Sequence, residues 1–441
     1  MATALIAGSG RAAEPKQTWS WERLLAQVEA THPLMDAAQA GLAQLEAKLG
    51  QAEWAIFPSF RLEAGGTITP KITGDALKSD TDWGTVGVFG KLGIDMVQPL
   101  WTFGKISALR AAAEAGVEVG HAAVDLARWE LRMRAAEAFY GRILAHELEA
   151  ILDEGKGWID KAERRMAKLR DEDSPDYDQL EHLRLKTRVA DFYTLQAQNE
   201  LLLVQASQGL RLLLRAEPGT EVTPEPEGLE PLACPLRDPA VYVAAARRHD
   251  PTVRVASSTA RAQHHLADAK AAEAWPDIVL LGNVDLTEAT VFEDQDSFFA
   301  RDPYHRRSVG AALGLRWKLD VPQRVLQTDE ARARARRASS EAEVAGDLSE
   351  FKVRGLVQEL ANKKSLIDVM RQSQKASQGW LTATWDTYEA GFGSFRDVMD
   401  ALVQFYQKRF GYLQLVFEHN ILIWKLNQAI GADACALGEA P

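Results

Sequence analysis

The sequence predicts a mainly helical chain with a small β part, built from one structural layout that occurs twice. Three observations lead to this prediction. Helix-breaking residues recur at a nearly constant offset, two very long runs contain no proline, and four shorter runs alternate between apolar and polar residues. Long helices joined to a few strands do not fit an ordinary compact domain, whose helices average about three turns.

The repeat is clearest in the prolines. Pro33 and Pro251 each lie early in a helical pattern, and Pro58 and Pro276 each end one. Both pairs have the same offset, since 251 − 33 and 276 − 58 are both 218. One such coincidence would mean little, but a shared spacing indicates a repeated unit. Each unit is read as helix, strand, loop, strand, very long helix, break and helix.

This reading divides the chain into five segments. Residues 1–13 end in Gly10-Arg11-Ala12-Ala13, loosely like the cleavage site of an export signal, although no basic segment precedes their short apolar run. We interpret the N-terminus either as a signal remnant or as a disordered end. The segments are 1–18 (signal remnant or disordered N-terminus), 19–215 (first repeat), 216–239 (linker), 240–431 (second repeat) and 432–441 (C-terminal tail).

The two long runs extend from about 106 to 170 and from about 325 to 387, and both are rich in strong helix formers. A helix of about 65 residues is about 100 Å long, which implies a coiled coil or a tube of helices. Between Leu126 and Ile143 the apolar residues follow mixed three- and four-residue spacing. Such a face is wider than a two-position seam and suits a barrel of helices, but a long antiparallel coiled-coil hairpin fits it nearly as well.

The four alternating runs predict strands with one apolar face and one face of polar or small residues. Each is about as long as a tilted strand that crosses a bilayer. Four strands cannot close a barrel, and open edges are not tolerated in lipid, so copies of the chain would have to share one. Two copies would give eight strands and three would give twelve, and a conduit favours three. The runs are 60–68, 85–96, 278–287 and 308–320, and the predicted outward loops are Lys71–Asp82 and Glu288–Arg307. Five tryptophans lie near the ends of these runs: Trp54, Trp83, Trp101, Trp275 and Trp317. At such positions tryptophans suit a membrane interface or ordinary core packing equally well.

Composition excludes several function classes. A net charge of −11 argues against nucleic acid and against a basic membrane-surface module. The two cysteines, Cys234 and Cys435, form no CxxC and are too few for a disulfide framework, so they neither prove nor exclude an oxidising compartment. His264 and His265 are adjacent and would point in different directions on a helix. We therefore expect no metal site, no cofactor and no enzyme activity, since phosphate-binding, nucleophile and HExxH motifs are also missing.

Two motifs resemble the TolC-like outer-membrane efflux protein family. Residues Tyr388–Ala401 read YEAGFGSFRDVMDA and are similar to the family's turn between two helices, which has Tyr, Gly three residues on, and Asp-Val-x-Asp-Ala. Gln98-Pro99-Leu100 resembles the family's Q-P-L-[FW] signature, and Gly104 follows it. The resemblance extends over about Trp19 to Gly431.

The resemblance implies both an architecture and a function. A homotrimer would form a twelve-stranded barrel in the outer membrane, continued by a periplasmic α-barrel of paired long-helix hairpins. The segment 216–239 and the C-terminus would form an equatorial region outside the tube. The channel would serve a tripartite efflux or type I secretion system, with a periplasmic adaptor and an RND- or ABC-type inner-membrane transporter as partners. It would pass small molecules or proteins out of the cell.

Asp397 and Asp400 match the family's two aspartates at the periplasmic entrance. They lie three residues apart at the start of a helix, so both could face a pore. Three chains would place six carboxylates in a ring that attracts cations. The alternative interpretation is helix capping, because acidic residues in a first turn stabilise the helix dipole.

The same turn is expected to control the entrance through Tyr388, Gly391, Ser394 and Arg396. Tyr388 matches a family tyrosine that holds the entrance closed by bonding the neighbouring hairpin. The acidic first-repeat turn offers Asp176 or Asp178 as the acceptor. The sequence departs from the family at Gly393, where the family's best-known example has a basic residue.

A coiled-coil scaffold without a pore, in the periplasm or the cytosol, is the alternative function. It would explain the long helices but would leave the four alternating strands without a purpose.

Overall fold

The structure is a computed structural model that describes residues 16–437 except 75–78, 176, 218–219, 226–227, 293–301 and 303. The predicted signal segment 1–13 lies outside the described residues, but Lys16–Ser20 forms a strand, so the N-terminal segment ends earlier than residue 18. The elements in chain order are β1 (Lys16–Ser20), α1 (Trp21–Thr31), α2 (Pro33–Trp54), β2 (Ser59–Gly74), β3 (Ser79–Trp101), α3 (Lys105–Asp171), α4 (Gln179–Leu214), β4 (Glu221–Glu225), α5 (Pro239–His249), α6 (Pro251–Ala272), β5 (Asp277–Ala289), β6 (Arg306–Arg316), α7 (Val321–Glu389) and α8 (Phe395–Ile430).

Two series of elements match in order and in length. α1 and α5 have 11 residues each, and α2 and α6 have 22 each. Two strands follow in each series. The long helices α3 and α7 then have 67 and 69 residues, and α4 and α8 have 36 each. Both predicted long helices are therefore present. No helix among the described residues is long and apolar enough to span a membrane.

The chain divides into two compact units. We call Leu42–Gly120 with Ala256–Ala342 the sheet unit, and the remaining residues the hairpin unit. Four helices contribute residues to both: α2, α3, α6 and α7.

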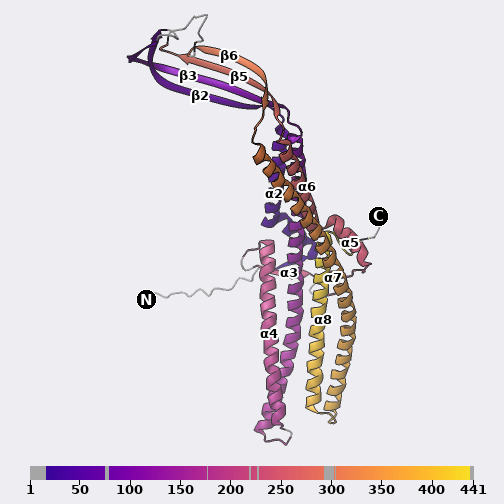
Figure 1. Ribbon diagram of the computed structural model, residues 1–441. Helices are drawn as coiled ribbons and strands as arrows, with labels where there is room; N and C mark the ends of the chain where they lie inside the picture. Colours follow the sequence, from indigo (N-terminus) through magenta and orange to yellow (C-terminus); the bar gives the residue numbers. More distant parts are fainter. Residues whose placement is uncertain are drawn as a thin grey trace, which may run out of the picture. The chain divides into compact units, whose positions relative to one another are not determined.

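The sheet unit contains one antiparallel sheet with the order β2-β3-β5-β6 (Figure 1). Directly opposite residues share a face, and the pairing register aligns the predicted alternation across all four strands. One face carries the row Leu62, Ile94, Val284 and Val309, and the other carries the row Arg61, Asp95, Asn283 and Gly310. The register thus gives the predicted apolar face and a second face on which polar and small residues predominate.

Several strand boundaries differ from the prediction. β2 continues to Gly74 and β3 begins at Ser79, so both ends of the predicted loop Lys71–Asp82 are strands. Their polar side chains do not prevent this, because the pairing uses backbone groups. β6 ends at Arg316 instead of Asp320, since its partner β5 begins at Asp277, opposite Arg316, and residues beyond it have no strand to pair with.

The five tryptophans near the strand ends are all at least half exposed. Trp83 is the most exposed at 81%, and Trp317 the least at 50%. Their interpretation as ordinary core residues is therefore wrong for the single chain.

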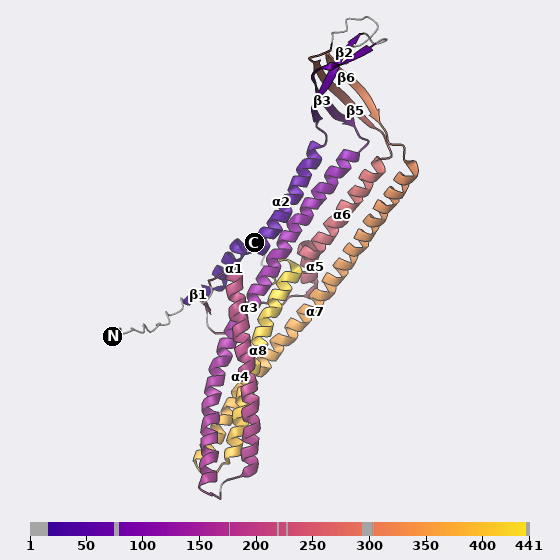
Figure 2. The same cartoon turned by 90° about the vertical axis from the view of Figure 1, so that its left-hand side faces the viewer.

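The hairpin unit contains α3 running beside α4 and α8 running beside α7 (Figures 1 and 2). Its main core is formed by apolar residues of α1, α3, α4 and α8, such as Phe139, Ile143, Leu210 and Val416. A second core joins α5, α7 and α8 around Tyr242, which is fully buried. The short strands β1 and β4 pair in parallel in the same unit.

The linker that follows β4 is fixed to α8 by polar groups. The buried Asn420 accepts from the Leu232 amide at 2.9 Å and donates to the Glu230 carbonyl at 2.8 Å. Cys234 of this linker forms a disulfide with Cys435, beyond the end of α8. The two residues are 201 positions apart, so no local pattern in the sequence indicated that they pair.

Candidate functional site

The candidate site lies at the ends of the two hairpins, where α3 turns into α4 and α7 turns into α8. The second turn requires glycine twice. Gly391 has φ +81°, a left-handed conformation that side chains rarely adopt. A Cβ on Gly393 would lie 2.9 Å from the Tyr388 amide nitrogen. A side chain at Gly393 would therefore require the backbone of this turn to shift.

Ser394 and Asp397 cap the start of α8. The Asp397 amide donates to Ser394 Oγ at 3.2 Å, and Ser394 Oγ donates to the Asp397 carboxylate at 2.8 Å. Ser394 is thus the N-cap of α8, and the Asp397 carboxylate holds its hydroxyl in place. The carboxylate of Asp397 is nevertheless exposed. Capping therefore describes its contacts within one chain, and the pore ring stays a prediction.

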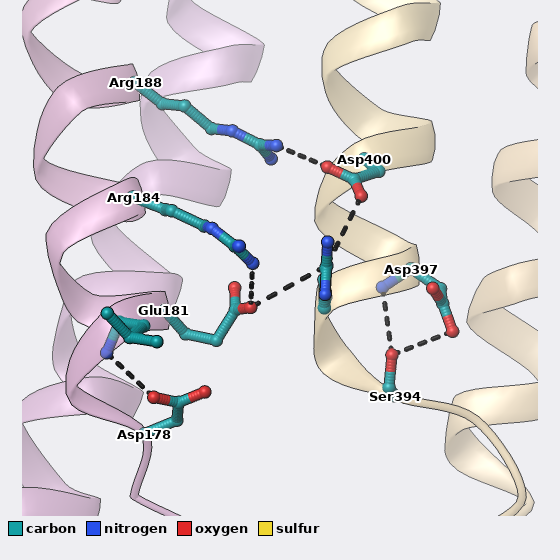
Figure 3. A network of polar contacts seen from close by, with 9 residues as sticks. Asp178, Glu181, Arg184, Arg188, Ser394, Asp397 and Asp400 are labelled. Atoms are coloured by element: carbon teal, nitrogen blue, oxygen red, sulfur yellow. Dashed lines mark hydrogen bonds and ion pairs between the residues drawn. The ribbon is translucent and has the colours of Figure 1, made fainter.

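Asp400 lies one turn further along α8 and points to α4 (Figure 3). It pairs with Arg188, and its other oxygen lies 4.0 Å from Arg396 Nε. Arg396 Nε also lies 3.8 Å from Glu181, which pairs with Arg184 at 2.7 Å. Alternating charges thus join α4 to α8.

Ion pairs at this end of the hairpin unit link Glu181, Arg184, Arg188, Arg396 and Asp400. Asp397 lies one turn before Asp400 and bonds Ser394 instead. We call these six residues the charge cluster. Arg396 and the two aspartates are predicted site residues, whereas the three residues of α4 were not predicted. Their spacing of three and four residues on one helix face was an available signal.

Tyr388 lies in an aromatic cluster. The Arg165 guanidinium of α3 lies 5.3 Å from the centre of the Tyr388 ring and 5.8 Å from that of Phe395. Trp385, one turn before Tyr388, packs edge-on against Trp158 of α3 with ring centres 4.9 Å apart. Cation–π and aromatic contacts therefore hold α3 to the second turn.

The expected partners of Tyr388 are placed as follows. Asp178 caps α4, where its carboxylate accepts from the Leu180 amide at 2.8 Å. Asp176 lies outside the described residues. The closing latch through the Tyr388 hydroxyl stays a prediction.

The His264 ring contacts α7. Its Nε2 lies 2.9 Å from Ser339 Oγ of α7. Within the described part of the chain, no group of three or more His, Cys, Asp or Glu residues could hold a metal ion.

The fold is similar to those of solved outer-membrane channels. The outer-membrane channel OprN matches with a TM-score of 0.76 and 19% identity, over 93% of this chain and 90% of that one. The CmeC outer membrane channel of Campylobacter jejuni matches with a TM-score of 0.75 and 13% identity, over 95% and 87%. The open state of the MtrE outer membrane channel of Neisseria gonorrhoeae gives 0.74 and 16%, over 95% and 91%.

No protein-family model and no curated protein matches the sequence. The likeness to the solved channels nevertheless extends over nearly the whole length of both partners in each comparison. This chain has the fold of the TolC-like outer-membrane efflux proteins, the family that its two motifs resemble.

Proposed function

We propose that this chain is one protomer of a trimeric outer-membrane channel. Its sheet would supply four of twelve strands in a shared barrel, and its two repeated hairpins would supply part of a periplasmic α-barrel. The observation that carries the proposal is the exposed apolar face of the sheet, together with the open edges of β2 and β6.

The apolar face of the sheet is largely exposed in the single chain, and exposing so much apolar surface to water is unfavourable. Leu62, Val309 and Leu313 are 65%, 82% and 72% exposed. Along β5 the apolar face extends over eight residues, from Ile278, which pairs with Leu315, to Leu286. At about 3.4 Å per residue and a tilt of about 40°, this gives a height of about 20 Å, close to the apolar band of outer-membrane barrels.

The edges of the sheet explain why copies are needed. β2 and β6 each have one neighbour in the sheet order. Unpaired backbone groups in lipid cost several kcal/mol each, so β6 of one copy would pair with β2 of the next. Three copies close a barrel of twelve strands, which is wide enough for a lumen.

The disulfide supports the expected compartment. Cys234 and Cys435 are bonded, and such bonds persist in oxidising compartments such as the bacterial periplasm. Both residues belong to the equatorial region of the hairpin unit, which the proposal assigns to the periplasm.

A matched pair of substitutions tests the membrane assignment. Leu313→Arg places a charge on the apolar face, whereas Thr67→Arg places the same charge on the polar face, where Thr67 is exposed. An Arg on the lipid face costs about 2–4 kcal/mol at the bilayer midplane and less toward the interfaces, and Leu313, opposite Leu280, lies one row from the end of the apolar band. We expect heat-resistant trimers in the outer-membrane fraction for the wild type and Thr67→Arg, and a large loss for Leu313→Arg. Equal assembly of both variants, or a soluble monomer, would favour the scaffold without a pore.

We further propose that the charge cluster forms the periplasmic entrance, where a multivalent cation would block the open pore. Because Arg188 neutralises Asp400, the exposed Asp397 would contribute most to the block. Asp397→Asn should therefore weaken block more than Asp400→Asn, and Arg188→Gln should strengthen it. Block in planar bilayers that is the same in all three variants would contradict the entrance ring.

The partners follow from the same proposal. A periplasmic adaptor and an inner-membrane transporter of the RND or ABC type would meet the hairpin ends, for efflux of small molecules or for protein secretion. Crosslinkers at Ser174 and Ser394, near the two turns, would capture the partner in the native host. Capture of an RND or an ABC transporter would distinguish between the two roles.

A further inference from the structure

The apolar core of the hairpin unit is interrupted by a cavity of about 370 Å³. On one side of it lies the main core, which includes Ile151. On the other side lies a small cluster of Ala162, Met166 and Leu185 near the hairpin ends. The walls come from three helices: Ile151, Leu152, Gly155 and Ile159 of α3; Leu185, Arg188, Asp191, Phe192 and Leu195 of α4; and Met399, Leu402, Val403, Tyr406, Gln407, Phe410 and Gly411 of α8.

The cavity has a buried apolar floor and an accessible mouth. Ile151, Leu152 and Leu402 are buried, whereas Asp191, Leu195 and Gln407 are exposed. A molecule could therefore enter without unfolding the helices. Since the floor is apolar, water inside would find few partners, and a hydrophobic ligand would restore the missing dispersion contacts.

Aromatic side chains from two helices line the space. Phe192 comes from α4, and Tyr406 and Phe410 come from α8. Gly155 lets the Phe192 ring lie against α3, because a Cβ there would be 3.2 Å from that ring. Rings on opposite walls favour a planar aromatic ligand, which can pack face-on or edge-on against them.

The polar groups of the walls are already engaged or lie at the mouth. Arg188 pairs with Asp400, and the Tyr406 hydroxyl bonds Glu154. Burial and the neighbouring Glu154 raise the pKa of Tyr406, so its phenol stays neutral. Asp191 is the charge at the mouth. A buried charge on a ligand would be costly, and an anionic substituent at the mouth would be repelled by Asp191.

We propose that this cavity is a binding site for small aromatic compounds of two or three rings, either neutral or carrying an amine that faces Asp191. Its volume lies within the range of ligand pockets, roughly 300–1,000 Å³. The proposal does not depend on a pore, because all the walls belong to one chain. A bound compound would contact α4 and α8 at once, beside the Arg188–Asp400 pair that joins them.

The test uses the full-length protein in amphipol and N-phenylnaphthylamine, a neutral arylamine whose fluorescence rises in apolar sites. We expect saturable binding of one probe per chain. Leu195→Trp, which fills the mouth from α4, should weaken binding at least tenfold. Leu201→Trp makes the same change at an exposed position of α4 outside the cavity and should leave the affinity unchanged.

A second variant and a second probe complete the experiment. Val403→Phe reduces the cavity from α8 and should also weaken binding at least tenfold. If it misfolds, Leu195→Trp decides alone, because an exposed position tolerates a larger side chain. Anilinonaphthalene sulfonate, an anionic arylamine, should bind at least tenfold more weakly than the neutral probe. The proposal is overturned if the wild type has no saturable site, if Leu195→Trp binds as well as Leu201→Trp, or if the two probes bind equally.

Discussion

Cys435→Ser removes the bond that ties the end of the chain to the linker after β4. The bond connects residues 201 positions apart, and Cys234 is buried in the core around Tyr242. Because the sequence separation is large, the crosslink removes much chain entropy from the unfolded state.

The size of the effect follows from this separation. The loop-entropy relation gives about 5 kcal/mol at room temperature for a loop of this length. For a unit of this size, each kcal/mol of unfolding free energy shifts the melting temperature by about 2–4 °C. We therefore expect Cys435→Ser to lower the melting temperature by about 10 °C or more.

The assay is thermal unfolding followed by circular dichroism, with and without reductant. The wild type should lose stability on reduction, and Cys435→Ser should not respond to reductant. The Cys234→Ser/Cys435→Ser double variant should match the single one, and Ala436→Ser, at an exposed neighbour, should behave as the wild type. If reductant does not change the melting temperature of the wild type, and if that temperature equals that of Cys435→Ser, the disulfide does not stabilise the fold.

Three further changes probe the same region. Asn420→Ala leaves the Leu232 amide and the Glu230 carbonyl without their partners, and we expect a loss of about 2–4 kcal/mol in denaturant unfolding. Asn420→Asp should also destabilise, because its buried carboxylate would face the Glu230 carbonyl with an acceptor in place of a donor; unchanged unfolding in both variants would contradict this role. Gly431→Ala should destabilise the end of α8 by about 2 kcal/mol or more, because φ is +63° and the new Cβ would lie 2.1 Å from the His249 carbonyl oxygen; unchanged melting would contradict this geometry. Burial lowers the pKa of His419, so below about pH 6.5 the unfolded chain takes up a proton that the folded chain refuses. Stability should therefore fall as the pH falls through this region, and His419→Gln should flatten the slope; an equal slope in both proteins would exclude His419 as its source.

Much of the fold could be predicted from local patterns. The long helices were found within a few residues of their ends because proline-free runs of helix formers leave no other regular structure open to them. The strands were found because a period of two is hard to mistake over ten residues. Their ends were less certain, since Arg316 ends β6 only because β5 begins opposite it.

The candidate site was predicted only in part. Asp397 and Asp400 are three residues apart, and the pattern suggested that they act together. In the structure Asp397 turns back to Ser394, whereas Asp400 pairs with Arg188, which is 212 positions away. No spacing within one helix could reveal that partner.

The sequence by itself determined the repeated order of the elements, their types and the apolar face of the sheet, because these depend on backbone preferences and on side-chain periodicity along one segment. Tertiary structure alone decided which charges neutralise each other, that Cys234 bonds Cys435, that Gly393 must lack a side chain, and where the core leaves a cavity. Each of these depends on distances between atoms that are far apart in the chain or across a tight turn. Such distances depend on how side chains from different segments pack, and local sequence patterns do not predict this packing.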